Sequence, residues 1–336
     1  MKRLSAVLAI NAALFTCSAQ TVAINAGRIS NEPVLRPGAH GTAWSSLGLF
    51  NPAAIQTGDK TVLLFRAQDD HHTSRIGYAE SKDGRTFTVR TEPVLAPEAP
   101  YEQGGGVEDP RVLRIRNLYY MTYTGYNLHD AQLCLATSTD LIHWQRKGVL
   151  LPAYKGTWNT QWTKSGAIVP EKIRGKWWMY YLGTKKDADG KSRDYMGLAS
   201  SEDLLHWQDA TSKPVLDRRP GAFDSRVMEP GPPPLITEAG ILLLYNGANE
   251  DLVYRPGWVL FDKDDPRRVI ARAKEPFIAP TLEWEKKGNV PNVIFLEGAV
   301  PESHPANSYA FQLTGYYGAA DKYIGGMRLH ISVSGK

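Results

Sequence analysis

Residues 133–144 read LCLATSTDLIHW, and two further stretches of the chain follow the same plan. They are IGYAESKDGRTF at 76–87 and MGLASSEDLLHW at 196–207, so successive copies begin 57 and 63 residues apart. Each copy is typical of a β-strand followed by a Ser-x-Asp turn and a closing aromatic residue. A looser copy begins at Gly257 and a truncated one at Ile324. Five copies of one unit indicate a repeat architecture.

A second repeated unit lies between these copies. It consists of a short polar entry, a few small or apolar residues, a turn and a long aromatic-rich strand. The polar entries are Asn51, Glu108-Asp109, Lys164, Glu229 and Glu297. The turns carry hairpin-type pairs such as Gly-Asp and Arg-Gly, and no stretch shows sustained helical periodicity. Five strand-rich units of about sixty residues predict an all-β, five-bladed β-propeller, with a two-sheet sandwich as the second choice.

The composition sets limits on the class of protein. The chain has 336 residues, of which 42% are hydrophobic, so it can build a large core. Charged residues make up 22% without a long run of one sign, which argues against disorder. The net charge of +4 is spread along the chain, and no basic stripe indicates a nucleic-acid partner.

The first nineteen residues are typical of an export signal. Lys2 and Arg3 precede an apolar run from Leu4 to Phe15, and small residues follow at 17–19. The run is too short to span a bilayer. We therefore predict a signal peptide at 1–19, an N-terminal extension at 20–44 and a catalytic propeller at 45–336, located in the periplasm or secreted and free of the membrane after cleavage. The remaining cysteine, Cys134, is expected to be a buried core residue.

In a propeller the innermost strand of each blade lines a central channel. If the polar entries open these strands, they converge on one funnel, although they are scattered along the sequence. This group of side chains contains carboxylates, a lysine and an amide, and the chain has no metal-binding His or Cys motif. We therefore expect no metal and no cofactor.

Two or three carboxylates around an aromatic-rich funnel suggest glycoside hydrolysis. One acid donates a proton to the leaving oxygen, and a second activates water on the opposite face of the sugar. Asp109 is the candidate acid. Trp158, Trp162 and Tyr126 are candidates to stack on sugar faces. Arg66 and Arg111 either bind hydroxyl groups or hold carboxylates ionised.

Several stretches together resemble glycoside hydrolase family 130, whose members are five-bladed propellers that act on β-mannosides. These are FNPAAI at 50–55, GVEDPRV at 106–112, KSGAIVPEKIRGKWWMYY at 164–181, GPPPLI at 231–236 and YYGAAD at 316–321. The resemblance implies that Asp109 is the general acid. It also implies that the mannosyl subsite includes Asn51, Arg66, Lys164 and Asp321. Glu108, Arg111, Asp224 and Asn246 complete the predicted substrate-binding set.

The chain departs from the pattern of the family's phosphorylases at three places, one of which is Tyr126-Asn127, where an arginine is expected. Glu229 brings a carboxylate before the Gly-Pro-Pro element, and Asn246 stands where the phosphorylases tend to have histidine. A carboxylate beside the acceptor site repels phosphate and can accept a proton from water. This pattern resembles the hydrolytic branch, with Glu229 preferred over Glu297 as the base.

The sequence therefore predicts an exported, inverting, exo-acting β-mannosidase for β-mannoside oligosaccharides, with β-1,2 linkages as the expected bond. The alternatives are a phosphorylase that makes mannose 1-phosphate and a non-catalytic glycan-binding propeller. The sequence does not indicate an oligomeric state.

Overall fold

The computed structural model describes residues 21–38, 41–302 and 309–334. The predicted signal peptide lies outside the described residues. Within them the regular secondary structure is almost entirely β-strand, and the one α-helix is the four-residue α1, Glu283–Lys286. The prediction of an all-β fold is confirmed.

None of the helices in the described part of the chain is long and apolar enough to cross a membrane.

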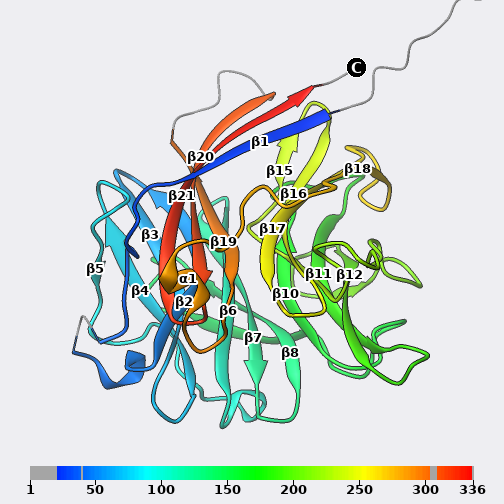
Figure 1. Ribbon diagram of the computed structural model, residues 1–336. Coiled ribbons are helices and arrows are strands. Elements are labelled where there is room, and N and C mark those ends of the chain that lie inside the picture. Colours follow the sequence, from blue (N-terminus) through cyan, green and yellow to red (C-terminus); the bar gives the residue numbers. More distant parts are fainter. Residues whose placement is uncertain (1–20, 39–40, 303–308, 335–336) are drawn as a thin grey trace, which may run out of the picture.

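The strands form antiparallel groups that follow the sequence repeats (Figure 1). The first group contains β2 (Gly48–Thr57), β3 (Lys60–Gln68), β4 (Ser74–Ser81) and β5 (Thr88–Val89). The second contains β6 (Gly106–Ile115), β7 (Leu118–Tyr126), β8 (Ala131–Ser138) and β9 (Gln145–Leu151). One parallel bridge, Ser74 to Gly106, joins these two groups into an eight-stranded sheet.

Three separate sheets complete the fold. The third group contains β10 (Thr163–Ile168), β11 (Trp177–Lys186), β12 (Ser192–Ser201) and β13 (Trp207–Asp209). The fourth contains β14 (Val227–Pro230), β15 (Leu235–Thr237), β16 (Gly240–Ala248), β17 (Tyr254–Phe261) and β18 (Val269–Arg272). The last contains β19 (Ile294–Pro301), β20 (Ala310–Ala319), β21 (Tyr323–Ser334) and β1 (Thr21–Arg28).

Strand β1 joins the beginning of the described chain to its end. It pairs antiparallel with β21 along its whole length, from Thr21 opposite Ser334 to Arg28 opposite Met327. Figure 1 shows the blue β1 beside the red β21. The segment predicted as an N-terminal extension therefore supplies the outer strand of the last sheet.

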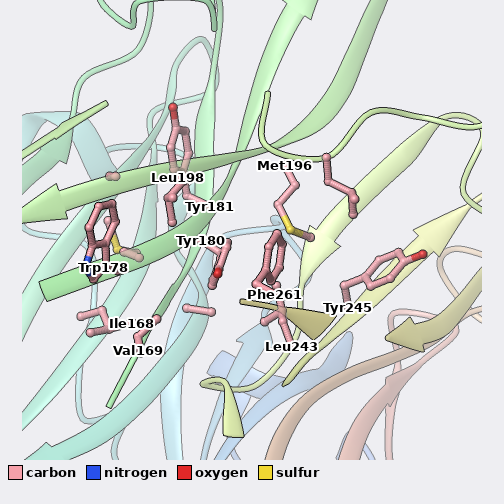
Figure 2. Packing of buried hydrophobic residues seen from close by; sticks show 14 of the residues in the cluster. Ile168, Val169, Trp178, Tyr180, Tyr181, Met196, Leu198, Leu243, Tyr245 and Phe261 are labelled. Carbon is pink, nitrogen blue, oxygen red and sulfur yellow. The ribbon is translucent and has the colours of Figure 1, made fainter. Parts of the chain in front are cut away.

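The cores lie between neighbouring sheets. Strand β11, WWMYYLGTKK, is buried on both faces, as expected for a central strand with an unbroken apolar run. Its Tyr180 stacks on Phe261 of β17 with 4.4 Å between ring centroids, and Figure 2 shows both rings with Tyr245 and Met196. The third and fourth groups are thus held together by interdigitated aromatic side chains.

The first strand of four groups is interrupted where the sequence places a polar entry. Pairing shifts between Phe50 and Pro52 in β2, Glu108 and Arg111 in β6, Lys164 and Ala167 in β10, and Leu296 and Gly298 in β19. β-Bulges of this kind re-aim side chains and are frequent beside active sites.

Three residues at these bulges have left-handed backbone conformations. The φ angles are 49° at Asn51, 49° at Asp109 and 57° at Ser165. Asn and Asp tolerate this region better than most residues. The bulges therefore place equivalent residues of successive repeats in the same unusual orientation.

Candidate active site

A cavity of ≈ 240 Å³ lies where the first strands of the groups meet. Its described lining residues are Asn51, Arg66, Asp109, Lys164, Glu229, Leu252, Tyr254, Val290, Val293, Phe295 and Asp321. Six of the predicted site residues are therefore brought to one cavity: Asn51, Arg66, Asp109, Lys164, Glu229 and Asp321. Their convergence agrees with the prediction of a shared polar site.

Asp109 lies among amide and cationic groups. Its Oδ1 accepts a hydrogen bond from Asn51 Nδ2 at 2.9 Å and another from Arg66 Nη1 at 3.3 Å. Its Oδ2 is 3.9 Å from Lys164 Nζ. Burial raises the pKa of Asp109, but Arg66, Lys164 and Arg111 outweigh it and lower the pKa to about 2. Asp109 is therefore ionised in the site without substrate.

Glu229 and Asp321 show the opposite shift. Glu229 is 7% exposed, and its Oε1 accepts a hydrogen bond from the hydroxyl of Ser165. Burial raises the pKa of Glu229 despite the charges of Lys164 and Arg111. Burial likewise raises the pKa of Asp321 to about 6, although Arg66 lowers it. One cavity thus holds carboxyl groups whose pKa values are shifted in opposite directions.

Glu108 holds Arg66 in place. Its Oε1 lies 2.6 Å from Arg66 Nη2, and Arg66 Nε donates to Ser74 Oγ at 3.0 Å. Ser74 Oγ also donates to Glu108 Oε1 at 3.3 Å. Glu108 is 4% exposed and is not among the described residues that line the cavity. Its direct contact with a substrate stays a prediction.

Arg111 and Glu297 are also buried rather than placed in the cavity lining. Their side chains are 1% and 0% exposed, and Arg111 Nη1 lies 3.2 Å from Glu297 Oε1. The bulge of β19 turns Glu297 toward this arginine. Neither residue is among the described lining residues, so their predicted contacts with water and sugar are not supported by this placement.

Asp224 and Asn246 are buried and bound to other parts of the protein, so this placement does not support their expected substrate contacts, which stay predictions. Asp224 is fully buried, pairs with Arg219 and Arg272, and accepts a hydrogen bond from the Tyr245 hydroxyl at 2.6 Å. Asn246 Nδ2 donates to the Leu296 carbonyl at 2.9 Å, and its Oδ1 accepts from the Leu296 amide at 2.8 Å. The contacts of Asp224 lie within the fourth group, whereas those of Asn246 join β16 to β19 of the last group.

A second cavity of ≈ 260 Å³ adjoins the first and shares Lys164, Glu229, Leu252 and Tyr254 with it. It is also lined by Trp162, Arg193, Asp194 and Arg226. Trp162 meets Tyr126 edge to face at 6.1 Å, whereas Trp158 belongs to a buried core cluster. Of the three aromatic candidates, Trp162 is therefore the one that this cavity presents to a ligand.

Ser165, Tyr254 and Asp194 belong to the site but are not among the residues predicted from the sequence. Ser165 could have been found from the repeats. It is followed by glycine, and the corresponding residues Asn51 and Asp109 are followed by proline, so each polar residue precedes a Gly or Pro. Tyr254 and Asp194 lie at the start of β17 and within β12, and their positions in the repeats carry no comparable signal.

The described residues contain no group of three or more His, Cys, Asp or Glu side chains arranged to hold a metal ion.

Several carboxyl groups that face one cavity on an all-β scaffold of repeated sheets are typical of carbohydrate-active enzymes. Trp162 in the adjoining cavity agrees with this class. The chain belongs to glycoside hydrolase family 130, because the family model, described as beta-1,4-mannooligosaccharide phosphorylase, matches residues 28–332. The family resemblance expected from the sequence is confirmed.

Two curated relatives are similar along most of the chain. The 1,2-beta-oligomannan phosphorylase of Thermoanaerobacter sp. (strain X514) is 39% identical over 308 residues, covering 89% of this chain and 95% of that protein. The beta-1,2-mannobiose phosphorylase of the same organism is 35% identical over 314 residues, with coverage of 89% and 95%. Both are phosphorylases, so these relatives favour the phosphorolytic alternative over the hydrolytic expectation.

A solved structure has a similar fold along nearly the whole chain. It comes from a study stating that the family of mannoside phosphorylases contains glycoside hydrolases that target beta-1,2 mannosidic linkages in Candida mannan. The TM-score is 0.77 at 33% identity, and the alignment covers 94% of this chain and 95% of that one. Both reactions therefore occur among proteins of this fold and family.

Proposed function

We propose that the protein cleaves terminal β-1,2-mannosidic bonds with inversion. The main observation in support is that Asp109 of β6 and Glu229 of β14 line the same cavity. The relatives support the substrate class, since both curated proteins act on β-1,2-mannosides by name. The cavity of ≈ 240 Å³ would hold the terminal mannosyl unit against Asn51 and Asp321.

We propose that the five strand groups are the blades of a five-bladed β-propeller, with their first strands around the axis. Side-chain contacts support this arrangement. Asn51 of β2 donates to Asp109 of β6, Ser165 of β10 donates to Glu229 of β14, and Arg111 of β6 meets Glu297 of β19. Contacts among all five first strands are expected around one axis and are hard to build in two stacked sheets.

Asp109 would supply the proton to the leaving oxygen, directly or through a sugar hydroxyl. Its pKa of about 2 means that the unliganded site holds this carboxyl ionised. Substrate hydroxyl groups that draw Arg66 and Lys164 away from Asp109 would raise its pKa and let it take up a proton. Protonation of Asp109 is therefore expected to accompany substrate binding.

Phosphate is the acceptor that the curated relatives support. A phosphate oxygen would attack the anomeric carbon from the face opposite the leaving oxygen, while Asp109 protonates that oxygen. The products would be α-mannose 1-phosphate and a mannoside shortened by one unit. Lys164 and Arg226 line the adjoining cavity and would balance the phosphate charge.

Water is the second candidate acceptor, and Glu229 is the observation that favours it. This carboxyl faces the cavity, is held by Ser165 and has a raised pKa, which suits a base that works near neutral pH. When ionised, it would also repel a phosphate dianion. The products would then be α-mannose and the shortened mannoside.

One experiment decides among these outcomes. β-1,2-Mannobiose is incubated with the protein, with and without inorganic phosphate, and the products are followed by proton NMR. Mannose 1-phosphate formed only with phosphate establishes phosphorolysis, whereas α-mannose formed without phosphate establishes hydrolysis. Binding without turnover on a broad β-mannoside panel would contradict the proposed activity and support a glycan-binding propeller.

We also propose that the protein is exported to the periplasm or the medium. The basic and apolar pattern of residues 1–19 supports this location. Cell fractionation with N-terminal sequencing of the mature protein tests it. Recovery of the full-length chain in the cytoplasm would contradict it.

A further inference from the structure

We propose that Arg111 and Glu297 form a buried positioning pair that fixes the strands carrying Asp109 and Glu229 relative to each other, without touching the sugar. This inference rests on the proposed function, because it assigns Asp109 and Glu229 to the reaction. It gives a different role to two residues that the sequence alone places among the catalytic and substrate-binding groups.

The contacts of Arg111 span three strands. Its Nη1 donates to the backbone carbonyl of Asp109, the candidate acid in β6, at 3.0 Å. Its Nη2 donates to the Pro230 carbonyl at 2.7 Å, and its Nε donates to the Gly231 carbonyl at 3.3 Å. Pro230 and Gly231 are the two residues after Glu229. The guanidinium therefore links the backbone of Asp109 to the backbone that follows Glu229.

Glu297 of β19 is the third strand's contact with Arg111. Its Oε1 lies 3.2 Å from Arg111 Nη1, and its Oε2 is buried without a hydrogen-bond partner among the described residues. The following residue, Gly298, lets β19 approach β2, because a Cβ there would lie 2.5 Å from the Ala54 backbone nitrogen. Strand β19 is thus packed tightly enough to hold Glu297 against the arginine.

The charges around Glu297 suit a neutral carboxylic acid. It faces Arg111 and Asp109 from β6, Glu229 from β14 and Arg66 from β3. Burial raises the pKa of Glu297 well above its usual range, although Arg111 opposes the shift. A protonated Glu297 leaves the charge of Arg111 free to act on Asp109 and Glu229, and that charge lowers the pKa of both.

The first test compares two substitutions of Glu297. Glu297→Ala removes the contact with Arg111 and is expected to lower kcat about tenfold or more. Glu297→Gln keeps the shape and the acceptor oxygen of the neutral acid, and it is expected to restore most of that loss. A base that takes a proton would instead lose about a hundredfold or more in Glu297→Gln as well. Such a loss, at an unchanged Tm, would overturn the proposal.

The second test concerns Arg111→Lys. A lysine ammonium cannot span the same set of acceptors as the planar guanidinium. We expect kcat to fall about tenfold or more while KM stays within about twofold, because the acids move but the sugar contacts remain. Arg114→Lys is the matched control on the same strand, since Arg114 is exposed and donates to the Arg116 carbonyl. A rise in KM with unchanged kcat would show that Arg111 binds substrate and would overturn the proposal.

A third measurement does not depend on turnover. Carboxyl titrations followed by carbon NMR compare the wild-type protein with Glu297→Gln. Because the proposal treats Glu297 as neutral, Asp109 and Glu229 are expected to titrate as in the wild type. A shift of about one pH unit or more in either group would show that Glu297 is charged in the wild type and would overturn the proposal. Absence of β-mannoside cleavage by the wild type would contradict the proposed function, but this titration would still test whether Glu297 is neutral.

Discussion

Asp109 and Glu229 occupy equivalent positions in two repeats, yet their surroundings shift their pKa values in opposite directions. Asp109 lies near Arg66 and Lys164, whose charges outweigh burial and lower its pKa. Glu229 receives a hydroxyl hydrogen bond from Ser165, and burial prevails and raises its pKa. The difference therefore arises from neighbours on other strands rather than from the local sequence.

Replacing Asp109 with asparagine tests its role as the proton donor. Asn keeps the left-handed backbone and the approximate shape of the side chain. We expect kcat on β-1,2-mannobiose to fall about a hundredfold or more, because the proton transfer is lost. Asp83→Asn is the control, since Asp83 lies in an exposed turn after β4 and accepts backbone hydrogen bonds. Comparable turnover of the two variants would remove Asp109 from the mechanism.

Replacing Glu229 with glutamine separates the two candidate acceptors. The change removes a base and a negative charge at the same position. If water is the acceptor, we expect the rate without phosphate to fall about a hundredfold or more. If phosphate is the acceptor, the loss of repulsion should preserve or lower KM for phosphate. Steady-state rates across a phosphate series measure both, with exposed Glu238→Gln as the control.

At the scale of elements, the repeats explain why part of the site could be predicted. The period located the first strand of each group and so brought Asn51, Asp109 and Glu229 together correctly. The third repeat differs by one residue from the expected register. Lys164 is the expected polar entry, whereas Ser165 has the left-handed conformation equivalent to that of Asn51 and Asp109. A one-residue register shift at a bulge depends on pairing with the next strand, which the sequence pattern does not show.

Two predicted site residues that lie outside the lining of the cavity have partners far away in the chain. Asp224 pairs with Arg272 of β18, and Asn246 bonds the backbone of Leu296 in β19. Neither contact follows from spacing or composition. The sequence could therefore predict which strands converge, but not which polar side chains their neighbours would occupy.

A buried ion pair ties β1 to α1, and this contact makes a prediction about stability. Arg28 at the end of β1 binds Glu285 through Nε at 2.6 Å and Nη2 at 2.7 Å, and the Glu285 side chain is fully buried. Arg28→Ala leaves this buried carboxylate without its cation. We expect the free energy of unfolding to fall by about 3 kcal/mol.

Urea denaturation measures this change against a matched arginine. Arg36 pairs with Glu32, but both side chains are exposed, so Arg36→Ala should change the free energy of unfolding by less than about 1 kcal/mol. Equal effects of the two variants would show that the ion pair of Arg28 does not anchor β1.

For the molecule as a whole, the fold gathers more acids than cations around its centre. Five acids share three cations, Arg66, Arg111 and Lys164; the acids are Glu108, Asp109, Glu229, Glu297 and Asp321. The unfolded chain separates these carboxyl groups and hydrates them. Acids with raised pKa values therefore oppose folding at neutral pH, a common consequence of building an active site.

Asp321 provides the test of this effect, because its pKa rises from an ordinary 3.8 to about 6 in the folded protein. The folded state then binds the proton more tightly than the unfolded state, so its contribution to stability decreases as the pH rises from about 4 to about 6. Asp321→Asn removes the ionisable group and accepts the left-handed φ of 49° at this position. We expect the variant to gain about 2 kcal/mol over the wild type at pH 8, allowing for partial exposure of the side chain, and little at pH 4. Urea denaturation across this range measures the difference, with exposed Asp59→Asn as the control. A difference that is constant with pH, or that shrinks as the pH rises, would show that folding does not raise the pKa of Asp321.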